Sequence, residues 1–512
     1  MTSAQKKAEE FLKNASYFHL GSLPTEGSHH QTRELTHLAN NDLPAAIDLL
    51  HQVDIAALRK LENYLPSLAP LKDAINQTLD SGGRIFICGC GATGRLALSL
   101  EYLWRQEQSK HKNSRSESVI GFMAGGDVAL VHSIEGFEDF SEYGSEHLIA
   151  LGFSENDLLI SSTEGGETSF VIGATEKAAS LSKRKPFFLY CNPRDTLIEH
   201  VERSRRVLLN PNINSICLEV GPMALSGSTR MQSSTVLMLA IGICLLGYSP
   251  SSLSDFIKFF EDSKTKDDVK KIMHFIKLES DIYLQKNRVL YSCEDLAITV
   301  FTDTTERAPT FSLPPFGNKT QSSEDQSMAY LMIPSANDVH ESWHKLLSRP
   351  PRVLEWSARS TKTTFEYLQG FDFSRHTLVY RQNNIKSARH YLFSIEHSGA
   401  SLSWKLEDLD LSLNISGAGN LFDHIYLKML LNIHSTLIMA RLGRSVSNFM
   451  TYVSPTNGKL IDRSARYTLW LLNQNNIFSI SYEQVIRELF RQLETLKSGE
   501  SVVLKTFEAL KL

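Results

Sequence analysis

The stretch Ile85-Phe-Ile-Cys-Gly-Cys-Gly-Ala-Thr-Gly-Arg95 decides the fold of this chain. It begins as an apolar strand, turns sharply at its glycines, and continues into a helical segment that starts Leu96-Ala-Leu-Ser. A helix placed after such a turn directs its free N–H groups and positive dipole end at a ligand. The alternative is that the glycines only allow tight packing of helix against strand. We predict a phosphate site, built on Gly91, Ala92, Thr93, Gly94 and Arg95.

The same glycines also match a nucleotide-binding pattern, since Gly89, Gly91 and Gly94 fit G-x-G-x-x-G. A dinucleotide site needs an acidic residue at the end of the second strand to hold a ribose. Here that strand-like run ends in glycines, and Asp127 comes only after them. No Lys-Ser/Thr pair follows the loop, as a nucleotide triphosphate would need. We therefore rank a simple phosphate ligand above a nucleotide.

Composition excludes several classes of protein. The 512 residues are 42% apolar with a net charge of −4, and they contain no long basic run, which argues against a nucleic-acid partner. The longest apolar run, Val236 to Leu246, is too short to span a membrane, and the first ten residues do not resemble a signal peptide. The six cysteines and 17 histidines show no metal-ligand spacing. We expect two or three domains, a cytoplasmic location, no metal and no cofactor.

Five apolar runs in the first half of the chain alternate with helical segments. This alternation predicts an α/β fold with a doubly wound parallel sheet, whose ligands bind at the carboxyl ends of the strands. The runs are Arg84–Cys88, Ser118–Met123, Asp157–Ser162, Pro186–Cys191 and Ser215–Val220. A second series follows from residue 288, and it looks like a decayed copy of the first without glycine-rich turns. Its runs are Arg288–Ser292, Ser327–Pro334, His376–Gln382, His390–Ser398 and Leu409–Ile415.

Three further loops carry side chains suited to binding or catalysis. Glu135 and Glu138 are three apart, so on a helical turn they share a face; the spacing fits either a solvated helix start or acid–base chemistry. Ser226-Gly-Ser-Thr-Arg230 is either a helix cap or a site for phosphate and sugar hydroxyls. The segment Thr163–Thr168 ends the third strand. Its Gly165 and Thr168 could meet the same ligand.

Six motifs in order resemble a known family. They are Thr25-Glu-Gly-Ser28, Gly89-Cys-Gly-Ala-Thr-Gly-Arg95, Ala124-Gly-Gly-Asp127, Ile134-Glu-Gly-Phe-Glu-Asp139, Cys191-Asn-Pro193 and Leu225-Ser-Gly-Ser-Thr-Arg-Met231. Their order and spacing over residues 20–250 are similar to the sugar isomerase (SIS) domain of N-acetylmuramic acid 6-phosphate etherase and of glucokinase regulatory protein. The resemblance implies a sugar-phosphate site that contains Gly227 and Ser228 as well as the residues named above.

The first half departs from the family pattern at three positions. Leu103 stands where the etherase has a catalytic Glu, and Gln232 and Met238 stand where the family has lysines. Two segments of the second half resemble the family segments that contain the missing glutamate and lysine. Asp303-Thr-Thr-Glu-Arg-Ala-Pro-Thr-Phe311 places a glutamate at 306, and Lys428-Met-Leu-Leu-Asn-Ile-His-Ser-Thr436 places a lysine at 428.

We therefore expect one split site, with its loops and Glu138 from the first half and with Glu306 and Lys428 from the second. The resemblance implies two tandem SIS-type, flavodoxin-like domains arranged as a pseudo-dimer, with a helical C-terminal lid. The expected divisions are a helical segment at 1–50 that packs on the second domain, a first SIS domain at 51–285, a degenerate SIS domain at 286–418 and a lid at 419–512. The second pseudo-site should be inactive, because Ser292-Cys-Glu-Asp-Leu296 has no glycine turn.

Three functions are compatible with this site. The fused, lid-bearing arrangement favours a regulatory sensor of the glucokinase-regulatory-protein type, which would bind a hexose- or aminosugar-6-phosphate and signal to a sugar kinase or another protein. The alternatives are an etherase, with Glu306 as base and Glu138 as acid, and a scaffold without a ligand. Glu164 and Glu167 are unusual for the family, because two carboxylates would repel a phosphate. Either they face solvent or the ligand is not the usual sugar phosphate.

Overall fold

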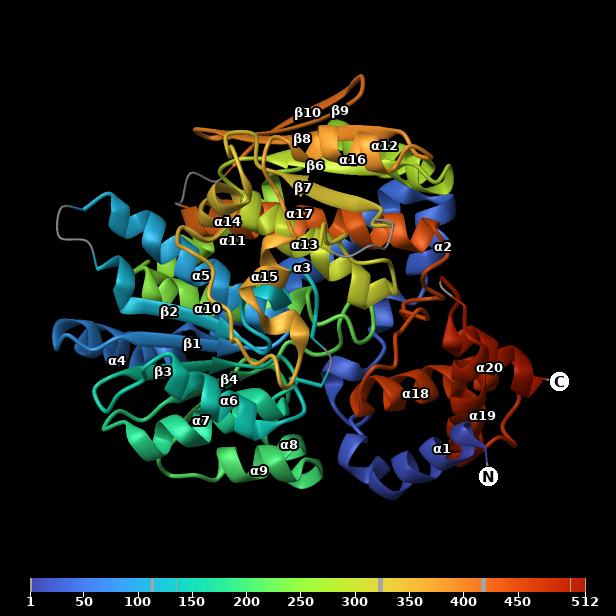
Figure 1. The fold of residues 1–512 in the computed structure, drawn as a ribbon, viewed down its shortest axis with the longest axis horizontal. Coiled ribbons are helices and arrows are strands. Elements are labelled where there is room, and N and C mark those ends of the chain that lie inside the picture. The colour runs from blue at the N-terminus through green and yellow to red at the C-terminus, as the bar shows by residue number, and fades with distance from the viewer. Residues whose placement is uncertain are drawn as a thin grey trace.

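The protein contains two five-stranded sheets, which lie apart with helices between them (Figure 1). The computed structural model describes residues 2–111, 115–134, 136–320, 326–415, 420–497 and 499–511. The two sheets, the helices around them and a helical C-terminal region confirm the predicted α/β class. No helix in these ranges is long and apolar enough to cross a membrane.

The first sheet is entirely parallel, in the order β2-β1-β3-β4-β5, which is the flavodoxin-like order. Its strands are β1 (Ile85–Gly89), β2 (Val119–Met123), β3 (Leu158–Ser162), β4 (Phe187–Tyr190) and β5 (Asn214–Cys217). All five predicted strands are confirmed. In the register, Gly89 lies beside Met123, and Cys88 lies beside Ser161. The loops after β1, β2 and β3 therefore leave the same edge of the sheet.

The second sheet is mixed, in the order β10-β9-β8-β6-β7. Its strands are β6 (Arg288–Cys293), β7 (Ala329–Met332), β8 (His390–Ser398), β9 (Ser401–Leu406) and β10 (Leu409–Asn414). Only β7, β6 and β8 are parallel, because β8, β9 and β10 form an antiparallel meander. The sequence prediction missed β9, although Leu402, Trp404 and Leu406 alternate as buried residues along it.

One predicted strand, His376–Gln382, is wrong: its residues from Thr377 onward belong to helix α16 (Thr377–Asn384), and His376 is the N-cap of that helix. Thr377 and Arg381, four apart, are buried on one face of this helix, whereas Val379 is 59% exposed. The Arg381 guanidinium stacks over the ring of Tyr330 and bonds Ser327. These tertiary contacts outweigh the strand preference of the local Val and Tyr residues.

The helices cover both faces of the first sheet and fill the space between the sheets (Figure 1). They are α1 (Ser3–Asn14), α2 (Leu35–Asn41), α3 (Leu43–Tyr64), α4 (Ala69–Asp80), α5 (Ala92–Ser109), α6 (Ser141–Ala150), α7 (Ser169–Leu181), α8 (Arg194–His200), α9 (Glu202–Leu208), α10 (Gln232–Leu245), α11 (Pro250–Asp262), α12 (Lys266–Leu284), α13 (Ala297–Phe311), α14 (Val339–Leu347), α15 (Phe365–Gln369), α16 (Thr377–Asn384), α17 (Asn420–Arg441), α18 (Gly458–Gln474), α19 (Tyr482–Thr495) and α20 (Val502–Lys511).

The two halves share one core. Every residue of α10 is buried, as expected for a helix that is apolar on all sides. This helix packs on α5 of its own half and on α17 of the second half, while α5 also contacts α13. At the other end of the molecule, α18, α19 and α20 form a helical group. The N-terminal helix α1 packs against α19, so both termini lie together (Figure 1).

A buried ionic cluster stabilises the second half. Glu279 of α12 is fully buried and accepts hydrogen bonds from His434 of α17 (2.7 Å) and Arg307 of α13 (3.0 Å). Tyr283 and Tyr291 donate their hydroxyls to the same carboxylate. Burial alone raises the pKa of Glu279, but His434 and Arg307 outweigh it and hold the pKa at about 2. The charged form of Glu279 is therefore part of the folded state.

We expect Glu279→Gln to destabilise the protein in a pH-dependent way. The folded pKa is about 2 against an ordinary 4.5, so the charge stabilises the fold fully above pH 4.5 and this contribution is lost as pH falls toward 2. The difference in unfolding free energy between wild type and variant should narrow by about 2 kcal/mol from pH 6 to pH 3. Urea unfolding of both proteins at pH 6 and pH 3 measures this difference in unfolding free energy. The exposed Glu508→Gln is the control, and an unchanged difference for Glu279→Gln would contradict the assignment.

Candidate active site

A cavity lies at the carboxyl ends of β1 and β2 and is lined by both halves of the chain. The first half contributes the loops after these strands and the loop before α10, and the second half contributes the end of α13 and the segment that leads into α18. The lining residues are Cys90, Gly91, Ala92, Arg95, Met123, Ala124, Ala129, Ser133, Ile134, Gly136, Glu138, Gly227, Ser228, Thr229, Arg230, Glu306, Pro309, Thr310, Met450, Val453, Thr456, Asn457, Lys459, Leu460 and Arg463.

The glycine loop turns directly into α5 at the cavity wall. Gly91 is the N-cap residue, with φ +54° and ψ −122°, a conformation that only glycine adopts without strain. The hydroxyl of Thr93 accepts from the amide of Cys90 (3.0 Å) and donates to its carbonyl (2.9 Å). Thr93 is buried, so it shapes the turn, whereas Gly91 and Ala92 face the cavity. The positive end of the α5 dipole lies at this wall.

Glu306 and Arg95 bring opposite charges to the cavity from the two halves. Glu306 lies near the end of α13, and Arg95 lies in the first turn of α5. Burial raises the pKa of Glu306, and the positive charges of Arg95 and Arg230 reverse only part of that rise. The Arg95 guanidinium donates to the carbonyl of Leu130 (3.1 Å) and to the hydroxyl of Thr305 (3.4 Å). Its Nε atom is buried without a partner among the described residues.

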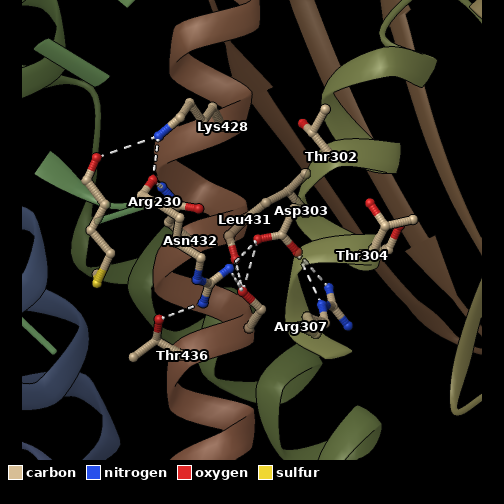
Figure 2. Close-up of polar contacts among 12 residues, drawn as sticks. Arg230, Thr302, Asp303, Thr304, Arg307, Lys428, Leu431, Asn432 and Thr436 are labelled. Carbon is tan, nitrogen blue, oxygen red and sulfur yellow. Dashed lines mark hydrogen bonds and ion pairs between the residues drawn. The ribbon is translucent and has the colours of Figure 1, made fainter. Parts of the chain in front are cut away.

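The Arg230 loop is held by residues of the second half (Figure 2). Arg230 donates to Asp303 (2.9 Å) and to the hydroxyl of Thr436 (3.0 Å). Lys428 donates to the backbone carbonyl of Arg230 (2.8 Å) and to the hydroxyl of Thr235 (2.7 Å). Burial lowers the pKa of Lys428 to about 8, although Glu306 and Asp54 act in the opposite direction. Lys428 therefore lies behind the wall and supports the loop, rather than lining the cavity.

Glu138 faces the same cavity from the loop after β2. One carboxylate oxygen accepts a hydrogen bond from the side-chain amide of Asn457, and the other accepts from the thiol of Cys90 (3.5 Å). Burial raises the pKa of Cys90, and the nearby charge of Glu138 adds to the rise, so this cysteine stays a thiol donor. Asn457 is also the N-cap of α18, since its side-chain oxygen accepts from the amide of Leu460 (2.9 Å). Glu138 is thereby tied to the C-terminal helices.

Two cations of α18 complete the wall, and sequence reasoning assigned them no role. Lys459 forms an ion pair with Glu167 (2.6 Å), and Arg463 forms one with Glu26 (2.6 Å). Burial lowers the pKa of Lys459, but Glu167 and Glu26 outweigh it and raise the pKa above its ordinary value. An Asn before a helical segment is a recognisable N-cap signal, so Asn457 marks the start of α18 in the sequence. No local signal indicates that the following cations reach this cavity.

The two unusual glutamates after β3 neither face solvent nor confront a ligand with two free charges. Glu164 and Glu167 are both buried. Burial by itself would raise the pKa of Glu167, but the positive charges of Lys459 and Arg203 outweigh this effect and lower the pKa below its ordinary value. Burial raises the pKa of Glu164 to about 8, which favours its neutral form at pH 7. The alternative that both glutamates face solvent is therefore wrong, whereas the alternative that the ligand is not the usual sugar phosphate stays a prediction.

The structure brings together eight of the residues predicted for the site. Gly91, Ala92, Arg95, Glu138, Gly227, Ser228, Arg230 and Glu306 line the cavity. Six others do not line it, and they are Thr93, Gly94, Gly165, Thr168, Ser226 and Lys428. Ser226 instead donates to the carbonyl of Glu26 (3.1 Å), and Thr168 contacts the hydroxyl of Thr163 (3.0 Å). Glu135 lies outside the described residues.

Two substitutions that separate the first half from the family pattern have structural roles. Leu103 is buried in the core on α5. Gln232 accepts from the amide of Ala224 (3.1 Å) and so fixes the segment before the Arg230 loop. Neither residue lines the cavity. Within the described ranges, no three His, Cys, Asp or Glu side chains are placed to hold a metal ion.

Comparisons with known proteins find similarity to sugar isomerase domains and to etherases. A model of the glucokinase regulatory protein N-terminal SIS domain matches residues 68–179. An N-acetylmuramic acid 6-phosphate etherase from Enterobacter sp. (strain 638) is 32% identical over 228 residues, which cover 44% of this chain and 70% of that protein. The etherase from Erwinia tasmaniensis is 33% identical over 228 residues, covering 44% and 68%. A solved glucosamine-6-phosphate deaminase from Thermotoga maritima aligns over 77% of this chain and 96% of its own, with 10% identity and a TM-score of 0.33.

The relatives correct the main functional prediction. The fused arrangement of two domains and a lid resembles the regulatory protein and so predicts a regulatory sensor rather than an etherase. That prediction is wrong, since the relatives that match over two thirds of their length are named as etherases. The match to the regulatory protein is confined to residues 68–179 of the first half. The resemblance to SIS domains itself is confirmed, and the chain belongs to the SIS-domain family of the N-acetylmuramic acid 6-phosphate etherases.

Proposed function

We propose that this chain is a lyase that cleaves the lactyl ether of N-acetylmuramic acid 6-phosphate. The observation that carries the proposal is the meeting of Glu138, from the first half, with Glu306, from the second, on one cavity. An etherase needs two carboxyl groups around one sugar, and this chain supplies them from different halves. The identity with etherases supports the choice of reaction.

The phosphate of the substrate would bind at the start of α5. Gly91 and Ala92 present backbone at the positive end of this helix, and Ser228 and Arg230 face the same space. The hydroxyl of Ser228 and the Nε of Arg230 are buried without partners in the described part of the chain. Buried polar groups of this kind cost free energy unless a ligand bonds them, so a bound phosphate would stabilise the site.

The reaction would proceed by elimination on the open-chain sugar. Glu306, as base, takes the proton from C2, which the C1 aldehyde acidifies. The electron pair forms a C2=C3 double bond while the bond from C3 to the lactyl oxygen breaks. Glu138, as acid, would enter this step protonated and give its proton to that oxygen. Lactate leaves, and water adds across the double bond. The raised pKa of Glu306 suits a base, because basicity increases as the pKa approaches the working pH.

The two halves would act as a pseudo-dimer, with the divisions expected from the sequence at 51–285 and 286–418. The correspondence of β1 and α5 with β6 and α13 supports this, since each strand lies between two parallel neighbours and is followed by a helix at the shared interface. Residues 419–512 would close the site through Asn457, Lys459 and Arg463. The segment 1–50 contributes Glu26, which is paired with two arginines of α18.

The direct test is to incubate the purified chain with N-acetylmuramic acid 6-phosphate and measure D-lactate with a coupled dehydrogenase. We expect one lactate for each sugar converted, together with N-acetylglucosamine 6-phosphate. N-Acetylglucosamine 6-phosphate as the added sugar is the control, because it has no ether and should release none. A folded chain that binds the substrate without releasing lactate would contradict the proposal.

A further inference from the structure

Arg230 reaches the cavity with part of its guanidinium free. An arginine has five N–H donors. Three of them are used, by Asp303 (2.9 Å), Ser435 (3.1 Å) and Thr436 (3.0 Å). All three partners belong to the second half, although Arg230 itself belongs to the first. The Nε atom is buried and has no partner among the described residues, so this donor is left for a ligand.

Asp303 is the one charged group among these partners, and each of its two carboxylate oxygens accepts two hydrogen bonds. Its Oδ1 accepts from Arg230 and from the hydroxyl of Ser435 (2.9 Å). Its Oδ2 accepts from the Nε (3.0 Å) and a terminal nitrogen (2.9 Å) of Arg307. Arg307 is fixed in turn by Glu279 (3.0 Å). Asp303 is itself buried and does not line the cavity, so it cannot act on a substrate directly.

We propose that Asp303, with Ser435 and Thr436, is the positioning group that aims Arg230 at the substrate phosphate. Figure 2 shows the hydrogen bonds of Arg230 with Asp303 and Thr436. The inference rests on the proposed sugar-phosphate site and gives the second half a role in binding beyond Glu306. Asp303 stands three residues before Glu306, so the two share a face of α13 one turn apart. The helix therefore fixes the phosphate-binding guanidinium and the base relative to each other.

This arrangement has a physical reason. A guanidinium binds a phosphate well only in a fixed orientation, because its donors lie in one plane. A surface arginine loses rotamer freedom on binding, whereas one already held by three side chains loses little. The ion pair with Asp303 crosses between the halves, so any shift of one half against the other would also turn Arg230 away from the phosphate.

The test uses the binding of N-acetylglucosamine 6-phosphate to the full chain, measured by titration calorimetry, because this sugar has no ether to cleave. We expect Asp303→Asn to weaken binding by at least tenfold and Arg230→Gln to weaken it by at least as much. The double variant should bind no more than about twofold worse than Arg230→Gln alone, since Asp303 acts only through Arg230. The control is Asp372→Asn, which removes another buried, ion-paired carboxylate of the second half, paired with Lys319 away from the cavity. It should leave binding within twofold.

Two results would overturn the inference: binding of Asp303→Asn within twofold of wild type, or losses that multiply in the double variant. If Asp303→Asn does not fold, the double variant Ser435→Ala/Thr436→Val tests the inference instead. We expect it to bind the sugar phosphate severalfold more weakly, and unchanged binding would contradict the inference. With the cleavable substrate, the folded Asp303→Asn should raise KM far more than it lowers kcat. A wild-type chain that binds the sugar phosphate without releasing lactate contradicts the proposed function and leaves this inference standing.

Discussion

Replacing Glu306 by glutamine is expected to lower kcat for lactate release by about 10²–10⁴-fold, the usual contribution of a positioned base. Glutamine keeps the size and the polarity of the side chain but cannot take the C2 proton. Because the amide removes a negative charge close to Arg95 and Arg230, sugar-phosphate binding should not weaken. Steady-state lactate release, with KM and kcat separated, measures the effect.

The control for this variant is Glu294→Gln. Glu294 follows β6, at the position that corresponds to the glycine loop after β1, and its carboxylate contacts Ser335 rather than the cavity. It should retain full activity, as expected if the second pseudo-site is inactive. Unchanged kcat in Glu306→Gln would remove Glu306 from the chemistry. Loss of activity in Glu294→Gln would instead point to a second site in the chain.

Replacing Gly91 by alanine is expected to weaken sugar-phosphate binding by about 100-fold, equivalent to about 2.7 kcal/mol. A Cβ at Gly91 meets no protein atom within 4 Å, because it would project into open space at a residue that lines the cavity. A methyl group there would push the phosphate away from the start of α5, where charge-assisted hydrogen bonds contribute about 1.5–3 kcal/mol each. The Kd for N-acetylglucosamine 6-phosphate measures the loss.

Gly82→Ala provides the matched comparison. Gly82 also has a positive φ, +78°, and a Cβ there also meets nothing within 4 Å, but it precedes β1 at the opposite end of the strand. Both substitutions should destabilise the fold through backbone strain, by about 1–3 kcal/mol each. Only Gly91→Ala should affect binding. Equal affinities in the two variants would place the phosphate elsewhere.

Local patterns predicted the first half of the molecule well. Each strand of the first sheet is a short apolar run followed by a loop and a helix, and burial on both faces leaves this pattern in the sequence. The glycine turn also has a local cause, since a Cβ at Gly89 would lie 2.2 Å from the carbonyl carbon of Thr93. The elements of the second half were harder to predict from the sequence. Helix α16 is stabilised by contacts of Arg381 with residues distant in the sequence. Strand β9 lies in an antiparallel meander, which the predicted parallel alternation of strands and helices does not include.

The sequence by itself determined the α/β class, the glycine turn before α5 and, through resemblance, the two glutamates that now line one cavity. Only the tertiary structure decided how the charges around that cavity are paired. Lys459 meets Glu167 across 292 residues, and Arg463 meets Glu26 across 437. Arg230 meets Asp303 across 73. A local window contains only one member of each pair, and the raised pKa of Glu164 likewise depends on burial by the whole fold. Strands, helices and turns require residue types at regular spacings, which can be recognised in the sequence. Ion pairs between distant residues and burial of charged groups produce no such local pattern.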